Sequence, residues 1–258
     1  MQFLDFTKKV VLITGAATGI GANAARYIAK LGGQMALVDI NATGLNEVVE
    51  QIKGDNSPNA LAIVADVTED SERIIAETIN HFGRLDVLVN NAAIGSEKNI
   101  MDADISDFDR MMNTNLRSIV ILTKLAVPHL EKSKGNIVNV SSISGIVPVK
   151  YAFYGMTKAA LDQFSKSAAN EFGPRNIRVN SVNPSFVLTP MFENAFTAEE
   201  ALRLKNKCKE RYPIGRMGRT EEISAAIAFL ASEAASFITG VQFAVDGGAI
   251  SAGAHYLN

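Results

Sequence analysis

Short runs of consecutive apolar residues alternate along the chain with longer stretches in which apolar residues recur at helical spacing. Residues 10–14 form an apolar, β-branched run, which is typical of a strand buried on both faces of a sheet. Residues 69–82 instead carry Ile74, Ile75 and Ile79 at the spacing of one helix face. The two patterns predict strands at 10–14, 34–39, 60–65, 86–90, 136–141, 177–182 and 241–245, and helices at 19–31, 43–53, 69–82, 106–130 and 152–172.

Strands that alternate with helices predict right-handed β–α–β crossovers, and therefore an α/β fold with about seven parallel strands and helices on both faces. The 258 residues contain no linker-like, repetitive or low-complexity stretch, so we expect a single domain over residues 1–258. Ser106 is expected to cap the long helix at 106–130. The segment 184–218 lacks this pattern, and segments of this length are usually functional, so residues 186–217 are predicted to form a substrate lid.

Composition removes several classes of protein. The 25 basic and 27 acidic residues give a net charge of −2, which argues against a nucleic-acid binder. Cys208 is the single cysteine and lies in a basic run that we interpret as a solvated helix, while His81, His129 and His255 show no metal-ligand spacing. No apolar stretch reaches the ~18 residues of a membrane span, and residues 1–9 lack a secretory signal. We expect a cytoplasmic protein without a metal, nucleic-acid or membrane partner.

A glycine-rich turn joins the first strand to the first helix. Glycines at this point allow a tight turn and a close approach of the backbone to a pyrophosphate, which the free N–H groups of the helix N-terminus then bind. An ordinary strand-to-helix turn is the alternative interpretation. The placement favours a Rossmann-type, doubly wound dinucleotide site, in the segment Thr14-Gly15-Ala16-Ala17-Thr18-Gly19-Ile20-Gly21.

Asp39 ends the second strand, at about the distance from the glycine-rich turn expected of a ribose-binding acid. A carboxylate there accepts hydrogen bonds from the adenosine ribose and repels a 2′-phosphate. Ile40 and the glycine-rich turn offer no basic residue to a phosphate. The sequence therefore favours NAD over NADP, with a helix-capping role for Asp39 as the alternative.

Tyr154 and Lys158 are four residues apart in a predicted helix and so share one face. A free phenol has a pKa of about 10, and a neighbouring ammonium lowers that pKa by favouring the phenolate. Tyr154 could then take a proton from an alcohol, or return one to a carbonyl, while a hydride moves to or from a nicotinamide. A surface tyrosine without a role is the alternative.

Together these residues resemble the short-chain dehydrogenase/reductase family over residues 9–248. The resemblance implies an oxidoreductase that transfers a hydride between a nicotinamide and a secondary alcohol or ketone, usually as a homodimer or homotetramer. It implies catalytic roles for Asn115, Ser142, Tyr154 and Lys158. It implies cofactor contacts from Gly15, Thr18, Gly19, Ile20, Gly21, Asp39, Ile40, Asp66, Val67, Asn91, Ala92, Tyr154, Lys158, Pro184, Val187 and Thr189.

The resemblance leaves two candidates for the catalytic serine. The family's common spacing to the tyrosine points to Ser141, whereas a glycine often found after the serine points from Gly145 to Ser142. Because successive side chains of a strand alternate between faces, only one of the two is expected to face Tyr154. We favour Ser142, with Ser141 packed on the opposite side.

The segment 186–217 is rich in large apolar residues, and a helix there would place Phe192, Ala195 and Phe196 on one face. This face predicts a lid over a hydrophobic small molecule, such as a sterol, an isoprenoid or an acyl derivative. Simple packing of the segment on the core is the alternative. Candidate pocket residues are Ser144, Ile146, Phe186, Phe192 and Phe196, with Ile94, Val147 and Val149 as further wall residues.

Two other functions compete. A methyltransferase also uses a glycine-rich first turn, but it does not require the pair Tyr154 and Lys158. A catalytically weak protein that only senses NAD would keep the cofactor site, and its usual sign is the loss of the serine, tyrosine or lysine. All three residues are present here, so the sequence favours the enzyme.

Overall fold

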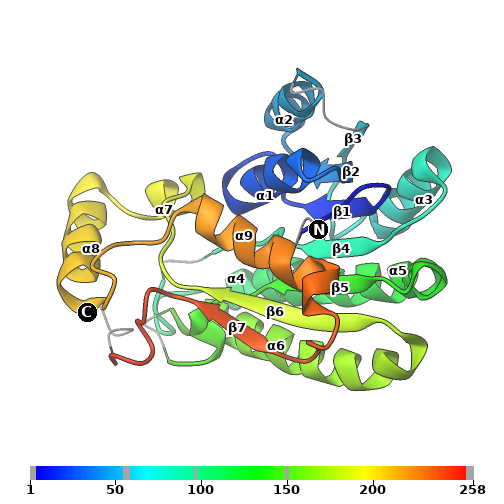
Figure 1. Ribbon diagram of the computed structural model, residues 1–258. Coiled ribbons are helices and arrows are strands. Elements are labelled where there is room, and N and C mark those ends of the chain that lie inside the picture. The colour runs from blue at the N-terminus through cyan, green and yellow to red at the C-terminus, as the bar shows by residue number, and fades with distance from the viewer. Residues whose placement is uncertain (1–3, 55–58, 96–97, 149–150, 254–258) are drawn as a thin grey trace.

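The computed structural model describes residues 4–54, 59–95, 98–148 and 151–253. Within these residues, seven parallel strands form one sheet in the order β3-β2-β1-β4-β5-β6-β7 (Figure 1). The predicted doubly wound α/β fold with seven parallel strands is therefore confirmed. The strands are β1 (Val10–Thr14), β2 (Gln34–Asp39), β3 (Ala60–Val64), β4 (Val87–Asn90), β5 (Asn136–Val140), β6 (Arg178–Pro184) and β7 (Gln242–Val245).

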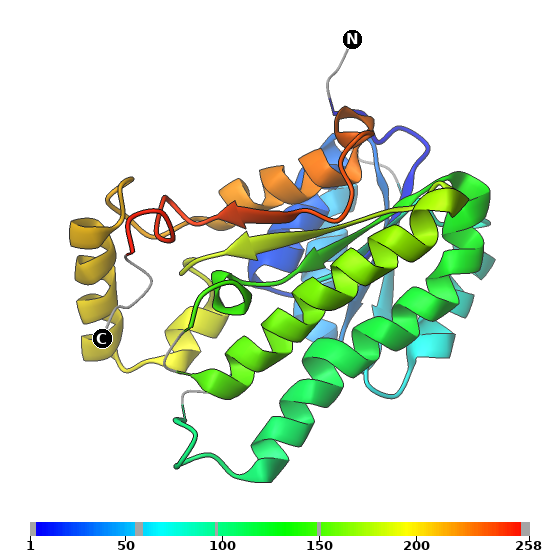
Figure 2. The ribbon, with the colours of Figure 1, turned by 90° about the horizontal axis from the view of Figure 1, so that it is seen from below.

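Helices cover both faces of the sheet, and Figure 2 shows α5 and α6 side by side on one of them. The α-helices are α1 (Gly19–Lys30), α2 (Ala42–Gly54), α3 (Ser71–Phe82), α4 (Ile105–Met112), α5 (Ser118–Ser133), α6 (Ala152–Phe172), α7 (Pro190–Ala195), α8 (Ala198–Arg211) and α9 (Thr220–Ala231). The core cluster on one face includes α1, α2 and α9, and the cluster on the other face includes α3, α5 and α6.

The central strand β1 shows why the sheet needs both layers of helices. Val11 and Ile13 belong to the cluster under α1 and α9, while Val10 and Leu12 belong to the cluster under α5 and α6. All four side chains are fully buried, as the uninterrupted apolar run predicted.

Among the described residues, no helix combines the length and the apolar character needed to cross a bilayer.

The long helix predicted at 106–130 differs from the structure in two ways. It begins at Ile105 with Asp104 as the N-cap residue, so the prediction that Ser106 caps it is wrong: Ser106 lies inside the first turn. A π-helical turn, Asn113–Arg117, also separates α4 from α5. Such turns are rare and often occur at functional sites. This one carries Asn115.

The strand order changes direction between β1 and β4, since β2 and β3 lie on one side of β1 while β4 to β7 lie on the other. In open parallel sheets, ligands bind at this point, outside the carboxyl ends of the strands. Helices α7 and α8 lie beyond the arrowheads of β6 and β7 in both views (Figures 1 and 2). The fold therefore places its ligand site at the carboxyl edge of the sheet.

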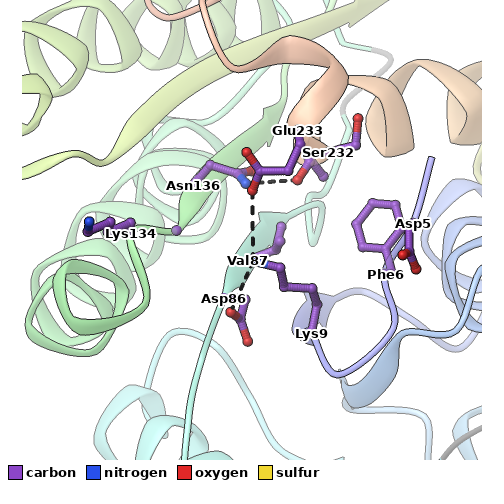
Figure 3. A pocket seen from close by; sticks show the side chains of 11 residues that line it. Asp5, Phe6, Lys9, Asp86, Val87, Lys134, Asn136, Ser232 and Glu233 are labelled. Carbon is purple, nitrogen blue, oxygen red and sulfur yellow. Dashed lines mark hydrogen bonds and ion pairs between the residues drawn. The ribbon is translucent and has the colours of Figure 1, made fainter. Parts of the chain in front are cut away.

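The amino ends of β1, β4 and β5 enclose only a small cavity of about 10 Å³ (Figure 3). Lys9 Nζ lies 3.7 Å from Asp86 Oδ1 and 3.8 Å from Glu233 Oε1, and Asp86 Oδ2 accepts a hydrogen bond from the backbone N–H of Val10 at 2.9 Å. A cavity of this size has room for about one water molecule. These contacts fasten the ends of the strands and offer no space for a substrate.

Candidate active site

The glycine-rich turn has the geometry of a phosphate cradle. Gly15 and Gly19 have φ values of +67° and +57°, in the left-handed region that favours glycine. A Cβ on Gly21 would lie 2.1 Å from the carbonyl oxygen of Gly15, so this position also requires glycine. The side chain of Thr18 makes no capping hydrogen bond at the start of α1, and Ile20 packs against the core. The helix N-terminus can therefore receive an anionic group, which fits the pyrophosphate of a dinucleotide.

Acidic residues lie at the carboxyl ends of β2 and β3, at the same edge. Asp39 Oδ2 accepts a hydrogen bond from the backbone N–H of Ala17 at 3.0 Å, and Asp39 Oδ1 accepts one from the N–H of Asn41 at 2.9 Å. The carboxylate of Asp39 is thus fixed to the glycine-rich turn, and Ile40 beside it is exposed. Asp66 is exposed and accepts two hydrogen bonds from Thr68.

The neighbouring Val67 is buried.

The end of β4 clamps the glycine-rich turn. Asn91 Nδ2 donates to the carbonyl oxygens of Thr14 and Gly15 at 2.9 and 3.0 Å. Thr14 Oγ1 in turn accepts hydrogen bonds from the backbone N–H groups of Asn91 and Ala92. The side-chain amide of Asn91 is therefore committed to the shape of the turn.

The π-helical turn aims Asn115 into the interior, where the residue is fully buried. Its Oδ1 accepts a hydrogen bond from the N–H of Ile94 at 2.8 Å, and its Nδ2 donates to the carbonyl oxygen of Ile94 at 2.9 Å. Nδ2 also lies 3.2 Å from the Oγ1 of Thr157, the residue before Lys158. Asn115 thus joins the segment after β4 to the helix that carries Tyr154 and Lys158.

The two candidate serines point in different directions. Ser141 is buried, and its hydroxyl donates to the backbone carbonyl of Lys158 at 3.2 Å. Ser142 Oγ hydrogen-bonds Ser144 Oγ at 3.0 Å and lies close enough to the phenol of Tyr154 to lower its pKa. Ser142 is therefore the serine that faces Tyr154, as the alternation of side chains along an extended chain requires.

Tyr154 and Lys158 share one face of α6, with Lys158 Nζ 5.5 Å from the centre of the tyrosine ring. Lys158 is almost fully buried, and its ammonium donates to the carbonyl oxygen of Val140 at 2.8 Å. Burial lowers the pKa of Lys158 to about 8, although the carboxylate of Asp162 opposes this change.

The phenol of Tyr154 departs from the sequence-based expectation. Burial raises the pKa of Tyr154 to about 12, and the nearby hydroxyl of Ser142 opposes this rise. The expected lowering by Lys158 is therefore not seen in the protein alone, where loss of hydration penalises the phenolate.

The segment that follows β6 reaches the glycine-rich turn. Pro184 is buried, and Val187 is buried beside Gly218, with which it forms a short parallel bridge. Thr189 is the N-cap of α7 and accepts a hydrogen bond from the N–H of Phe192 at 3.2 Å. A Cβ on Gly19 would lie 3.5 Å from Thr189, so α7 begins next to the glycine-rich turn.

Four aromatic rings gather over this edge. Ring centres lie 5.8 Å apart for Phe186 and Phe192, 5.2 Å for Phe192 and Phe196, and 6.4 Å for Tyr151 and Phe196. The predicted shared helix face is only partly correct, because α7 ends at Ala195 and Phe196 follows in an extended conformation. Phe196 nevertheless packs on Phe192.

The other predicted pocket residues lie after β5, near Ser142. Ser144 is half-buried and Ile146 is 39% exposed. Val149 lies outside the described residues.

The expectation of a solvated helix around Cys208 is wrong for this residue. Cys208 is fully buried in α8, and burial raises the pKa of its thiol to about 11.

No cluster of potential metal ligands occurs within the part of the chain that the structure describes, which leaves out His255. The sequence assigned no role to three residues of the site: Tyr151 in the aromatic group, Asp162 one turn after Lys158 on α6, and Asn183 on β6. A signal existed for Asp162, which follows Lys158 at helical spacing.

The comparisons with known proteins identify the class. A family model described as enoyl-(acyl carrier protein) reductase matches residues 15–249. The chain belongs to the short-chain dehydrogenase/reductase family of oxidoreductases.

Individual relatives cover nearly the whole chain. An uncharacterized oxidoreductase of Thermotoga maritima is 39% identical over 95% of this chain and 98% of its own. The meso-2,3-butanediol dehydrogenase of Serratia marcescens is 36% identical over 95% and 96%. Among solved structures, the 3-ketoacyl-(acyl-carrier-protein) reductase of Brucella melitensis, complexed with NADH, matches with a TM-score of 0.86 and 33% identity over 95% of this chain and 99% of that one.

Proposed function

We propose that this protein is an NAD-dependent alcohol dehydrogenase or carbonyl reductase that transfers a hydride between the nicotinamide and a secondary alcohol or ketone. The convergence of Ser142, Tyr154 and Lys158 at the end of β5, on the same edge of the sheet as the glycine-rich turn, carries the proposal. The test is the formation of reduced cofactor from NAD and a panel of alcohols, with Tyr154→Phe as the inactive control.

The residues of the cradle fit a dinucleotide and would hold it. Gly15, Gly19 and Gly21 would admit the pyrophosphate, and Asp39 would accept hydrogen bonds from the adenosine ribose. The end of the site near Pro184, Val187 and Thr189 would receive the nicotinamide, with Lys158 on the adjoining ribose. NAD, when bound, supplies the hydride acceptor, or the hydride donor in its reduced form.

The protein's own residues would then handle the proton. Ser142 would hold the substrate oxygen by a hydrogen bond, and Tyr154 would exchange the proton with that oxygen. With a pKa of about 12, the phenol of Tyr154 keeps its proton at neutral pH and is ready to donate it to a ketone. For alcohol oxidation, the phenolate needs nearby positive charge, which the ammonium of Lys158 and the oxidised nicotinamide would provide.

We further propose a hydrophobic substrate, of sterol, isoprenoid or acyl type, beneath a lid formed by residues 186–217. The aromatic rings of Phe186, Phe192 and Phe196, which pack in one apolar cluster with Val147, support this proposal. A wall of this kind binds apolar surface and excludes water from the reacting atoms.

Phe196→Ala should raise the KM for bulky apolar alcohols by about tenfold and leave the KM for a short alcohol nearly unchanged. The reason is the loss of roughly 1–2 kcal/mol of apolar contact, which only a large substrate makes. Steady-state kinetics on alcohols graded by size measure the effect. Better turnover of small polar alcohols than of bulky apolar ones by the wild-type protein would contradict the hydrophobic assignment.

A cytoplasmic homodimer or homotetramer is proposed for the assembly. Phe237 is completely exposed, and Phe243 on the last strand is 37% exposed, which supports a contact between copies at that edge of the sheet. Light scattering on the purified protein should give two or four times the mass of one chain, and Phe243→Glu should lower it. A monomeric wild-type protein would contradict the proposal.

A further inference from the structure

A buried carboxylate, Asp162, follows the proposed proton-transfer pair on the same helix. Asp162 follows Lys158 by one turn of α6, and only 1% of its surface is exposed. The proton transfer between Tyr154 and substrate makes no use of it. A buried carboxylate is costly unless it is paired and hydrogen-bonded, so its contacts indicate what it does.

The carboxylate is connected to the backbone of Ser142 by two hydrogen bonds. Asn183 is fully buried on β6, and its Nδ2 donates to Asp162 Oδ2 at 2.8 Å. The same Nδ2 donates to the carbonyl oxygen of Ser142 at 2.9 Å. Asp162 therefore holds Asn183 in the orientation that fixes the turn carrying Ser142.

Close packing at Gly145 joins the same turn to α6. A Cβ on Gly145 would lie 2.6 Å from Asp162 Oδ2 and 2.7 Å from the carbonyl carbon of Lys158. The turn that begins at Ser142 thus rests directly on the helix segment between Lys158 and Asp162. Three elements meet at Asp162: this turn, the end of β6, and α6.

The electrostatics of this junction involve few groups. Burial raises the pKa of Asp162, and the hydrogen bond from Asn183 and the charge of Lys158 oppose this rise. The carboxylate in turn opposes the lowering of the Lys158 pKa by burial. Among the described residues that pack here, Tyr154, Lys158 and Asp162 are titratable and all lie on α6, while the other elements contribute hydroxyl and amide groups.

We propose that Asp162 is a positioning residue for the proton transfer: it orients Ser142 through Asn183, and its negative charge keeps the ammonium of Lys158 in the charged form. This inference rests on the proposed function. It assigns Asp162 no contact with substrate or cofactor, so its effects must appear through Lys158 and Ser142.

Asp162→Asn tests the charge while keeping the shape and an oxygen that can accept from Asn183. NMR of protein carrying lysine labelled at the ε-carbon, with the Lys158 signal assigned by its loss in Lys158→Arg, gives the titration midpoint of Lys158 without any turnover. We expect this midpoint to fall by about one pH unit in Asp162→Asn. In alcohol oxidation, the alkaline limb of kcat should move to lower pH by a similar amount, while the KM for NAD stays within twofold.

Asp86→Asn is the matched control, because Asp86 is another buried carboxylate but lies at the amino ends of the strands (Figure 3). It should lower the thermal midpoint of unfolding without moving the Lys158 titration or the pH profile. Asp162→Ser, which leaves room for a water molecule, replaces Asp162→Asn if that variant does not fold.

The outcomes separate the two proposals. An unchanged Lys158 midpoint in folded Asp162→Asn or Asp162→Ser overturns the inference, whether or not the enzyme turns over. A lowered midpoint together with a wild-type protein that oxidises no alcohol and reduces no ketone supports the electrostatic role of Asp162 and counts against the proposed function instead.

Discussion

Replacing Tyr154 with phenylalanine should reduce kcat for both alcohol oxidation and ketone reduction by about 10³-fold, since the variant lacks the hydroxyl that exchanges the proton with substrate. The ring and its contact with Lys158 Nζ, 5.5 Å from the ring centre, remain possible in the variant. The KM for NAD should therefore change little, and the loss should appear in the chemical step.

The measurement is the rate of reduced-cofactor formation together with cofactor binding followed by fluorescence. Ser142→Ala is the companion variant, and we expect a smaller loss of about 10²-fold, because it removes a hydrogen bond to the substrate oxygen and leaves the proton acceptor in place. Ser141→Ala provides the matched control, since Ser141 faces the backbone of Lys158 and not Tyr154. Activity of Tyr154→Phe within tenfold of the wild type would contradict the mechanism.

The double variant Asp39→Ser, Ile40→Arg should shift the cofactor preference from NAD towards NADP by roughly 10²- to 10³-fold in the ratio of kcat/KM values. Asp39 repels a 2′-phosphate, and opposite charges that approach to about 4 Å near a protein surface attract with ~4 kcal/mol before screening by salt. Ile40 is exposed, so an arginine there can reach solvent and a phosphate without disturbing the core.

Kinetics with both cofactors at constant ionic strength measure the ratio. Asp66→Ser is the control, because Asp66 also follows a strand at the carboxyl edge but is expected at the adenine, where both cofactors are the same. It should weaken both cofactors equally. A wild-type protein that prefers NADP would overturn the role proposed for Asp39.

The parts of the fold that could be predicted were those set by local patterns. The apolar run of β1 and the helical spacing of α3 each gave the correct element. Alternation along an extended chain predicted that only one of Ser141 and Ser142 faces Tyr154, while the preference for Ser142 came from Gly145. The glycine-rich turn was also recognisable, because the left-handed backbone at Gly15 and Gly19 favours a residue without a Cβ.

The parts that could not be predicted depend on contacts between distant segments. The π-helical turn at Asn115 exists where its side chain binds Ile94 and Thr157, which local helical spacing does not reveal. The raised pKa of Tyr154 follows from the burial of its phenol in the folded chain. The role of Asp162 depends on its hydrogen bond with Asn183 of β6, a contact that the sequence of the helix does not reveal.

The strand order has a consequence for how the chain acquires its site during synthesis. β1 lies between β2 and β4, so its first partner follows closely in the chain, whereas the second arrives only after α2, β3 and α3 have been made. Until then the glycine-rich turn lacks Asn91, whose amide binds the carbonyls of Thr14 and Gly15. A nascent chain that ends before β4 would thus have three of the seven strands but no finished phosphate site, and cofactor would stabilise the protein only late in folding.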